Sequence, residues 1–471
     1  MTRDDARLWR TEKAARMRVI VDADDYFRIA RDAMMQARRR IMLIGWDFDA
    51  RIRLIRDGHE PGEPETVGDF ILWLAERNPE LEVFLLRWDV GALKTVVRGS
   101  TILTVLRWMR HPRIQTKLDA FHPTGASHHQ KVVVIDDCFA FCGGIDMTGE
   151  RWDRRDHEDD DPGRTLPNGK PYKPWHDATA AVEGPVAAAL GEMARERWRR
   201  AGGTALTAIE ERSDCWPEGL DVDFRDIPVG IARTFPEMPD QDGVREIETL
   251  FLAQIAAVRT SLYVESQYFA SRKIAEASAR RLDEADGPEI VIVNPLTAQG
   301  WLEPLAMDTA RARLMAALAA RDRHGRLRLY HPFTEGGAPI YVHAKILIAD
   351  GRTLRIGSAN MNNRSLGLDT ECDLVIEAES AADRARVAEI RDDLLAEHLG
   401  VEPETVTRAI ESHGSLIGAI EALRGDGRSL RPYRDPNLSE TERWLADNEV
   451  LDPESPQEMF EAQTGRGLFR R

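Results

Sequence analysis

The sequence predicts an α/β protein made of two duplicated halves, each a mixed β-sheet between α-helices, related by a pseudo-two-fold axis. Three observations support this prediction. The pattern His-x-Lys-x4-Asp occurs twice, over residues 129–136 and 343–350. Each copy continues at the same offset into a Gly-rich turn, over 143–146 and 357–360. In each half an amphipathic helix also precedes the opening strand. Repetition in register indicates an internal duplication.

The elements follow from the spacing of the apolar residues. Residues 25–37 and 247–258 carry apolar side chains at helical intervals, so each predicts a helix with one buried face. Short runs rich in β-branched residues predict buried strands. The strands expected outside the motifs are 41–46, 81–88, 262–269 and 290–294.

We expect four parts in chain order: a first half over 1–205, a connecting segment over 206–240, a second half over 241–400 and an extension over 401–471. The connecting segment is rich in proline. The extension holds a helical stretch near 406–423 and a polar tail without an assignable role. Residues 154–173, rich in Asp, Gly and Pro, form a long loop near the first motif. The sequence leaves open whether this loop is a lid or binding loop or a disordered insertion.

Both motifs begin in a predicted β-hairpin. Residues two apart on a strand point to the same face, so His129 and Lys131 lie side by side, as do His343 and Lys345. Facing the halves together places two imidazoles and two ammonium groups around one cavity. This arrangement predicts a single composite site rather than two separate ones.

The aspartates that end the motifs have a different expected role. Asp136 and Asp350 each lie five residues beyond the motif lysine, so their strand parity is opposite and they should point away from the cavity. We interpret both as structural residues that tie down the hairpin turn.

The four groups of the cavity suit transfer of a phosphodiester. Two lysines neutralise the charge that grows on the non-bridging oxygens in the transition state. One neutral imidazole can attack phosphorus, and the other, protonated, can donate to the leaving oxygen. The lysines supply the positive charge, and the chain has no Cys-x2-Cys pair and no His-Glu-x2-His run. We therefore expect no metal and no cofactor.

Residues around the motifs resemble a known family. The pieces are Ile44 to Phe48, Ser127 to Lys131, Gly143 to Asp146, Glu150 to Asp153, Pro174 to Asp177, Gly184 with Pro185, Tyr263 to Phe269, Ile356 to Ser365 and Asp369 to Glu371. They resemble the phospholipase D superfamily over roughly residues 20 to 395, most closely phospholipases D proper, as in a bacterial member with motifs of the eukaryotic type. Gly144 and Asp146 stand where Ser and Asn are usual, a departure that the eukaryotic type shares.

The resemblance implies roles for individual residues. An acidic residue downstream of each motif holds the imidazole, and Asp177 fits this position after the first motif and Glu371 after the second. His129 is implied as the nucleophile and His343 as the general acid, which the sequence alone does not distinguish. The residues implied in substrate binding are Gly144, Asp146, Ser358 and Asn360.

Composition narrows the class of protein. The 471 residues carry a formal net charge of −16, which disfavours a polyanion substrate. The basic clusters at 38–40, 107–113 and 197–200 fit helix ends better than a groove for nucleic acid. No apolar run is long enough to span a membrane, and the N-terminal stretch lacks an apolar signal region. We expect a cytoplasmic monomer, because both motifs lie in one chain, with four reduced cysteines and transient contact at the inner membrane face.

The expected function is that of a phospholipase D, which hydrolyses or transphosphatidylates glycerophospholipid head groups through a covalent phosphohistidine. The alternatives are a nuclease or a cardiolipin synthase-like phosphatidyltransferase. The head group and the preferred acceptor, water or alcohol, stay open. A lipid substrate needs an apolar approach to the cavity. The candidates for its rim are Trp46, Trp152, Trp175 and Trp301, and a buried core position is an equal alternative for each.

Overall fold

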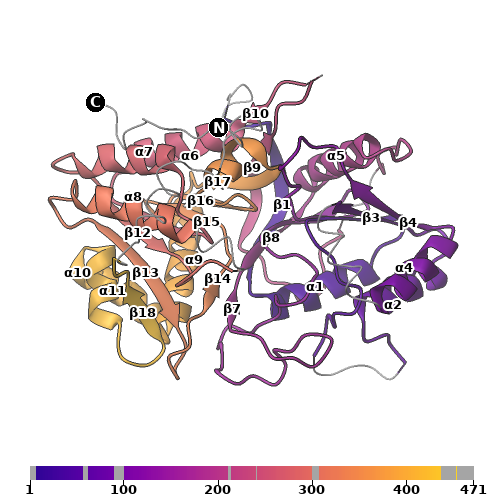
Figure 1. Cartoon of the computed structure of the whole chain (residues 1–471), viewed down its shortest axis with the longest axis horizontal. Coiled ribbons are helices and arrows are strands. Elements are labelled where there is room, and N and C mark those ends of the chain that lie inside the picture. Colours follow the sequence, from indigo (N-terminus) through magenta and orange to yellow (C-terminus); the bar gives the residue numbers. More distant parts are fainter. Residues whose placement is uncertain are drawn as a thin grey trace.

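One continuous β-sheet runs through the molecule, with helices on both sides of it (Figure 1). The computed structural model describes residues 7–56, 62–89, 100–210, 214–239, 241–299, 307–435 and 452. The strand order is β18-β13-β12-β11-β15-β16-β17-β9-β1-β8-β6-β5-β2-β3-β4, and β10 pairs with β9 beside this path. A separate two-stranded sheet joins β7 to β14. Among the described residues, no helix is long and apolar enough to cross a membrane.

The elements of the two halves have the following bounds. In the first half they are β1 (Arg10–Val21), α1 (Ala23–Met35), β2 (Arg40–Gly45), α2 (Val67–Arg77), β3 (Glu82–Trp88), α4 (Ser100–Arg110), β4 (Ile114–Asp119), β5 (Val132–Ile135), β6 (Phe139–Gly143), β7 (Trp175–His176), β8 (Ala178–Glu183) and α5 (Pro185–Arg200). In the second they are β9 (Phe224–Phe235), β10 (Val244–Arg245), α6 (Glu246–Ala257), β11 (Ser261–Glu265), α7 (Arg272–Leu282), β12 (Glu289–Val293), α8 (Thr309–Ala319), β13 (Leu327–Phe333), β14 (Tyr341–Val342), β15 (Ile346–Ala349), β16 (Thr353–Gly357), η3 (Arg364–Leu368), β17 (Glu371–Glu377), α9 (Ala381–Leu399), α10 (Pro403–His413), α11 (Leu416–Leu423) and β18 (Ser429–Pro432).

The sheet order confirms the predicted duplication. Outward from the centre, β1-β8-β6-β5-β2-β3-β4 on one side matches β9-β17-β16-β15-β11-β12-β13 on the other. At the centre β1 and β9 pair antiparallel, with Arg10 opposite Ile231, so two mixed sheets become one. Neither strand was predicted from the sequence. β9 lies within 206–240, the segment expected only to connect the halves, and it instead forms part of the junction.

The elements that the sequence did predict are present. The helices expected over 25–37 and 247–258 are α1 and α6, and the stretch near 406–423 is the pair α10 and α11. The four strands expected outside the motifs are β2, β3, β11 and β12. The predicted polar tail begins with β18, which pairs with β13. Beyond residue 435 only Asp452 is described, and it accepts hydrogen bonds from the backbone N–H groups of Asn363 and Arg364.

The core is divided among the helical layers. α1 and α2 pack on one face of the first half, and α6, α7 and α8 pack on one face of the second (Figure 1). A third core contains apolar residues of both halves, including Leu190 of α5 and Leu394 of α9. Because the halves share this core and the central strand pair, they form one body that can hold residues of both halves around one site.

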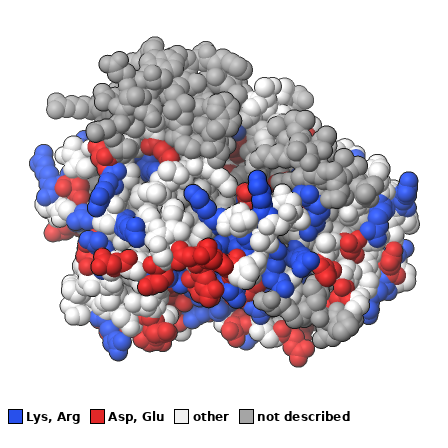
Figure 2. All heavy atoms as spheres, turned by 60° about the horizontal axis from the view of Figure 1, so that its bottom comes forward, with Lys and Arg blue, Asp and Glu red and all other residues white. Residues whose placement is uncertain are grey.

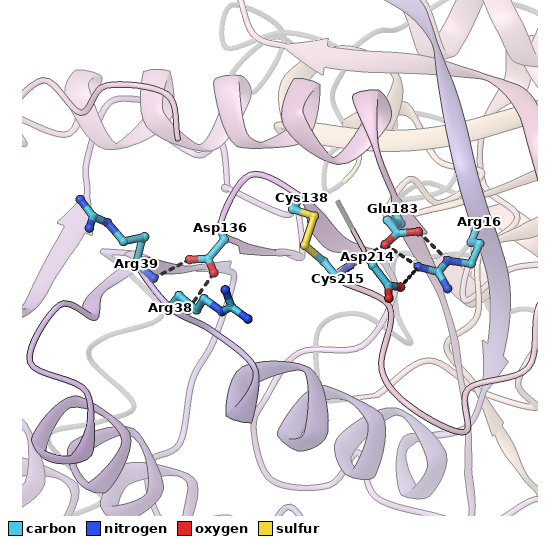
Figure 3. Close-up of a disulfide and its surroundings, with 8 residues drawn as sticks. All are labelled: Arg16, Arg38, Arg39, Asp136, Cys138, Glu183, Asp214 and Cys215. Carbon is cyan, nitrogen blue, oxygen red and sulfur yellow. Dashed lines mark hydrogen bonds and ion pairs between the residues drawn. A yellow bond between two sulfur atoms is a disulfide. The ribbon is translucent and has the colours of Figure 1, made fainter. Parts of the chain in front are cut away.

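A disulfide joins Cys138, in the turn between β5 and β6, to Cys215, 77 residues later and 6.1 Å away between Cα atoms (Figure 3). The expectation of four reduced cysteines is therefore wrong for this pair, whereas Cys142 and Cys372 are free and buried. The chain before β9 folds back against β8, where Cys215 N–H donates to Glu183 Oε1 at 2.6 Å. Such a long-range return leaves no spacing pattern in the sequence.

The loop over 154–173 packs against the core. His157 is completely buried, and Arg164 lies 3.0 Å from Asp153 Oδ1. Tyr172 also donates its hydroxyl to the backbone carbonyl of Trp152 at 2.7 Å. The alternative of a disordered insertion is therefore wrong.

Candidate active site

The segments that carry the two histidines cross into the opposite half. The backbone N–H of His129 donates to the carbonyl of Thr370, just before β17, at 3.0 Å. The backbone N–H of His343 donates to the carbonyl of His176 in β7 at 2.7 Å, because β14 pairs in parallel with β7. Each motif is thus positioned by the strand that carries the acidic residue of the other half.

His129 is held with its Nδ1 atom turned towards acceptors. Nδ1 lies 3.0 Å from both carboxylate oxygens of Glu371 and 3.1 Å from the backbone carbonyl of Ser358. Since these groups accept hydrogen bonds, Nδ1 carries the proton and Nε2 keeps its lone pair. This is the tautomer that a nucleophilic imidazole needs.

His343 is held in the same way by one acceptor. Its Nδ1 lies 2.7 Å from Asp177 Oδ2, and its ring packs against Trp175 with centroids 5.1 Å apart. The expected pairing within each half, Asp177 with His129 and Glu371 with His343, is wrong. The strand exchange instead brings each carboxylate to the histidine of the other half. The composite site therefore needs both halves.

The two lysines lie beside the histidines of their own motifs. Lys131 Nζ is 2.7 Å from the backbone carbonyl of His129 and 3.2 Å from Asp146 Oδ2. Lys345 Nζ donates to the backbone carbonyl of His343. Both lysine side chains are nearly inaccessible to solvent, so their charges act at short range and with little screening.

Burial and the lysines shift the pKa values of the site. Burial, and after it the charges of Lys131 and Lys345, holds the pKa of His129 well below its usual value. Burial, then Lys345, Arg151 and Lys131, does the same to the pKa of His343. Because both lysines act on both imidazoles, the two motifs converge on one place. Both imidazoles are neutral at neutral pH before an anionic substrate arrives.

Burial also shifts the charged partners. It raises the pKa of Glu371 to about 8, against hydrogen bonds from the hydroxyls of Ser358 and Ser365, and it raises the pKa of Asp177. It lowers the pKa of Lys345 to about 7. Glu371 and Lys345 therefore titrate near neutral pH, where a bound anion changes their protonation.

The positions implied in substrate binding flank the histidine partners. A Cβ on Gly144 would lie 2.1 Å from Asp177 Oδ1, which explains why the usual Ser is absent there. In the second half Ser358 has room and donates its hydroxyl to Glu371. Asp146 forms an ion pair with Lys131 and accepts a hydrogen bond from the Trp46 N–H, whereas Asn360 donates to Gln267 Oε1 at 3.4 Å.

Asp136 and Asp350 bind backbone rather than site groups. Asp136 accepts the N–H groups of residues 38–40 at 2.7 to 2.8 Å, where the turn enters β2. Figure 3 shows the bonds from Arg38 and Arg39. Asp350 accepts those of residues 259–261 at 2.8 to 3.1 Å, before β11. Each aspartate therefore fastens the motif hairpin to the turn before the neighbouring strand.

A pocket of about 390 Å³ is lined by Trp175, Tyr341, Ile340, Pro295 and Leu296 among others, and it adjoins the site through Trp175, whose ring packs against His343. The Trp175 ring stacks on Tyr341 with centroids 4.6 Å apart. Of the other tryptophans proposed for an apolar rim, Trp152 is a core residue, Trp46 is half-buried and stacks on Trp88, and Trp301 lies outside the described residues. Trp175 is buried too, but it is the one that forms part of a pocket wall.

Residues that could hold a metal ion lie behind the site. Within the described part of the chain, two buried groups qualify: Asp22, His157, His176 and Glu397, and His176 with Glu265 and His398. Sequence reasoning missed them because their members come from distant segments. His176 was visible only as part of the Trp-His-Asp piece. Ser365, whose hydroxyl lies 2.7 Å from Glu371 Oε1, was also missed as a site residue.

Comparisons with known proteins match both halves. A family model described as phospholipase D matches residues 33–219, and one described as cardiolipin synthase, PLD-like domain, matches residues 251–390. Phospholipase D alpha 1 of Vigna unguiculata is 25% identical over 80% of this chain and 64% of its own length. Phospholipase D A of Dictyostelium discoideum is 25% identical over 82% of this chain and 36% of its own. The chain therefore spans less than two thirds of these relatives.

A solved structure shares the fold. The phosphatidylserine synthase of Haemophilus influenzae Rd KW20 aligns with a TM-score of 0.56 at 12% identity, covering 87% of this chain and 96% of its own. At that identity the likeness concerns the architecture of two joined halves and carries no argument about substrate.

Proposed function

This chain belongs to the phospholipase D superfamily, and we propose that it cleaves the head group of a glycerophospholipid and passes the phosphatidyl group to water or an alcohol. The observation that carries the proposal is the crossed site. Each of two His-Lys pairs has its imidazole held, through Nδ1, by a buried carboxylate of the opposite half. The distant relatives named phospholipase D favour the same reaction.

In the proposed first step, His129 Nε2 attacks phosphorus and the bond to the head-group oxygen breaks. The lysines neutralise the non-bridging oxygens as their charge grows. The bound phosphate also offsets the lysine charges that lower the pKa of His343, so His343 can take up a proton and give it to the leaving oxygen. In the second step His343 removes a proton from water or an alcohol, which attacks phosphorus and releases His129.

The pocket beside His343 supports a lipid substrate. Its walls combine the stacked rings of Trp175 and Tyr341 with proline and aliphatic side chains, a surface suited to an apolar or quaternary ammonium group. Its position next to the general acid suits either the leaving head group or the acyl side of the lipid. Head-group competition experiments distinguish the two.

Charge distribution favours lipid over nucleic acid. The basic clusters at 107–113 and 197–200 lie at the ends of α4 and α5, and Arg197 is buried in an ion pair with Asp119 at 2.6 Å. The face that Figure 2 shows carries basic and acidic side chains interspersed. A polyanion groove would need a continuous run of exposed cations. We therefore rank a nuclease below a lipid enzyme.

A phosphatidyltransferase is the second candidate. The match of the second half to a model described as cardiolipin synthase favours it, and it would use the same phosphohistidine with a lipid alcohol as the acceptor. The two candidates differ in acceptor, so product analysis separates them.

The disulfide is an indication of the cellular compartment in which the protein folds. The sequence favoured the cytoplasm, with contact at the inner membrane face. The Cys138–Cys215 bond favours an oxidising compartment, because disulfides rarely persist where thiols are kept reduced. We propose such a compartment, and fractionation of the native host with immunodetection would decide between the two.

The direct experiment incubates the purified protein with phosphatidylcholine vesicles and ethanol, with single-stranded DNA as a parallel substrate. We expect choline release and phosphatidylethanol, both lost in His129→Ala and retained in Arg110→Ala, which changes an exposed helix end. Cleavage of DNA without turnover of phosphatidylcholine, phosphatidylethanolamine or phosphatidylglycerol would replace the lipid assignment by a nuclease. Cardiolipin formed from phosphatidylglycerol with little hydrolysis would favour the transferase.

A further inference from the structure

Four metal-binding side chains meet behind the active site, each from a different segment. Asp22 precedes α1, His157 comes from the loop over 154–173, His176 is in β7, and Glu397 is in α9 of the second half. Their side chains are at most 1% exposed. A buried set of two imidazoles and two carboxylates requires an explanation, because isolated buried charges are costly.

The spacing of the donor atoms fits a tetrahedral ion. His157 Nε2 lies 3.1 Å from Glu397 Oε1 and 3.5 Å from Asp22 Oδ2. His176 Nδ1 lies 2.7 Å from Glu397 Oε1 and 3.3 Å from Asp22 Oδ1. Bonds of about 2.0 to 2.1 Å from zinc to nitrogen or oxygen place tetrahedral ligands about 3.3 Å apart. The contacts lie on both sides of that value, with Asp22 Oδ2 nearest His157 and Asp22 Oδ1 nearest His176, so one of these two oxygens would be the ligand.

The outer nitrogens of both imidazoles are held as in known metal sites. His157 Nδ1 lies 2.9 Å from Asp153 Oδ2, and His176 Nε2 lies 2.8 Å from Glu265 Oε2. A carboxylate that accepts the outer N–H fixes the tautomer and turns the other nitrogen, with its lone pair, inwards. Glu397 is oriented from outside too, because its Oε2 accepts Arg155 Nε at 2.6 Å.

Two inward atoms make ion-pair contacts without hydrogen-bond geometry. Asp22 Oδ2 and His176 Nδ1 are fully buried, and their contacts with His157 Nε2 and Glu397 Oε1 are not directed as hydrogen bonds. Charge gives an independent indication. Four carboxylates meet here, those of Asp22, Asp153, Glu265 and Glu397. Within the described part of the chain, the guanidinium groups that pair with them are those of Arg155 and Arg164. A divalent cation would satisfy both the atoms and the charge.

We propose that Asp22, His157, His176 and Glu397 bind one divalent transition-metal ion, for which Zn²⁺ is the best match to two imidazoles and two carboxylates in a closed four-ligand set. The site is structural. The backbone N–H of Asp22 donates to the carbonyl of Asp177 at 2.8 Å, and the Asp177 N–H donates to Asp22 Oδ1 at 3.0 Å. The ion would thus join α9 of the second half to the junction of β7 and β8 that carries Asp177, without touching substrate.

The test measures bound metal rather than lipid turnover, so it does not depend on the proposed function. The full chain, purified without added metal or chelator, is analysed by inductively coupled plasma mass spectrometry. It is then stripped by dialysis against a strong chelator and titrated with Zn²⁺ in competition with a chromogenic chelator. We expect about one ion per chain and one tight Zn²⁺ site. His157→Ala should lose the ion, and the exposed His324→Ala should retain it.

Asp153→Asn keeps all four ligands and tests the site if His157→Ala does not fold. Loss of an outer carboxylate weakens metal affinity about 10- to 100-fold. The proposal is overturned if the purified chain holds no stoichiometric metal and the stripped chain binds no Zn²⁺ at micromolar concentration, which would mean that two imidazolium groups neutralise the carboxylates. It is equally overturned if metal binds but the affinity is unchanged in both His157→Ala and Asp153→Asn.

Discussion

Glu371 and Asp177 hold different histidines, so replacing each carboxylate should impair a different event: nucleophilic attack for Glu371 and protonation of the leaving group for Asp177. Glu371→Gln replaces an acceptor oxygen beside His129 Nδ1 by an amide that can also donate. Asp177→Asn does the same beside His343 Nδ1. In the serine-protease triad, the same change of a carboxylate to an amide lowers kcat about 10⁴-fold because the imidazole adopts the wrong tautomer. Both variants should therefore fold and lose rate.

The structure modifies that magnitude differently at the two sites. His129 Nδ1 has a second acceptor, the backbone carbonyl of Ser358 at 3.1 Å, which preserves part of the correct tautomer in Glu371→Gln. His343 Nδ1 differs, because among the described residues its hydrogen-bond acceptor is Asp177 Oδ2 alone. We expect kcat to fall about 10²- to 10³-fold for Glu371→Gln, a barrier increase of about 3 to 4 kcal/mol. For Asp177→Asn we expect about 10³- to 10⁴-fold.

The assay compares two leaving groups. Choline needs a proton from His343 as it departs, whereas p-nitrophenolate leaves without one. Asp177→Asn should therefore recover most of its burst rate on phosphatidyl-p-nitrophenol, and Glu371→Gln should be equally slow on both substrates because attack itself is impaired. Glu183→Gln, at a buried ion pair with Arg16, controls for loss of a buried carboxylate. Rescue of Glu371→Gln but not Asp177→Asn would refute the assignment of roles.

Three further predictions test other contacts. Gly144→Ser places a Cβ 2.1 Å from Asp177 Oδ1, so it should lower kcat at least about 100-fold. Ser358→Gly removes one hydroxyl from Glu371 and should lower kcat about 10-fold. Equal losses of kcat in the two variants would count against the packing argument. Burial lowers the pKa of Lys345 to about 7, so its charge is present below that pH and lost above it, and kcat/KM should fall on the alkaline side. Lys345→Arg should remove that alkaline limb at a lower rate, and an unchanged limb would assign it to another group. Unfolded, unreduced protein should show two reactive thiols rather than four. Cys215→Ser should lower the free energy of unfolding by about 4.5 kcal/mol, from a loop of 77 residues in the chain-entropy model, and an unchanged denaturation midpoint would contradict this.

The parts of the structure that could be predicted from the sequence are those that depend on local patterns. The spacing of His129 and Lys131 predicted a common face, and the structure brings both to the site, although they lie just before β5 rather than on it. The second copy at His343 indicated the duplication. The same parity correctly separated Asp136 from the site. These inferences need only neighbouring residues and the geometry of one strand.

The parts that were missed depend on contacts between distant segments. The junction of β1 and β9 pairs Arg10 with Ile231, and β9 looked like a linker because its segment is rich in proline. The exchange of Glu371 and Asp177 follows from strands of one half reaching the other. Nothing in the local sequence of either motif encodes it. The return of Cys215 to Cys138 is of the same kind.

The central claim is that two motifs form one site in which His129 is the nucleophile. Rapid acid-free quenching during turnover of phosphatidyl-p-nitrophenol, followed by peptide mass spectrometry, tests it directly. We expect a phosphatidyl adduct on the peptide that contains His129, increased in His343→Ala, where the second step lacks its base, and absent in His129→Ala. An adduct on His343, or steady turnover by His129→Ala, would contradict it.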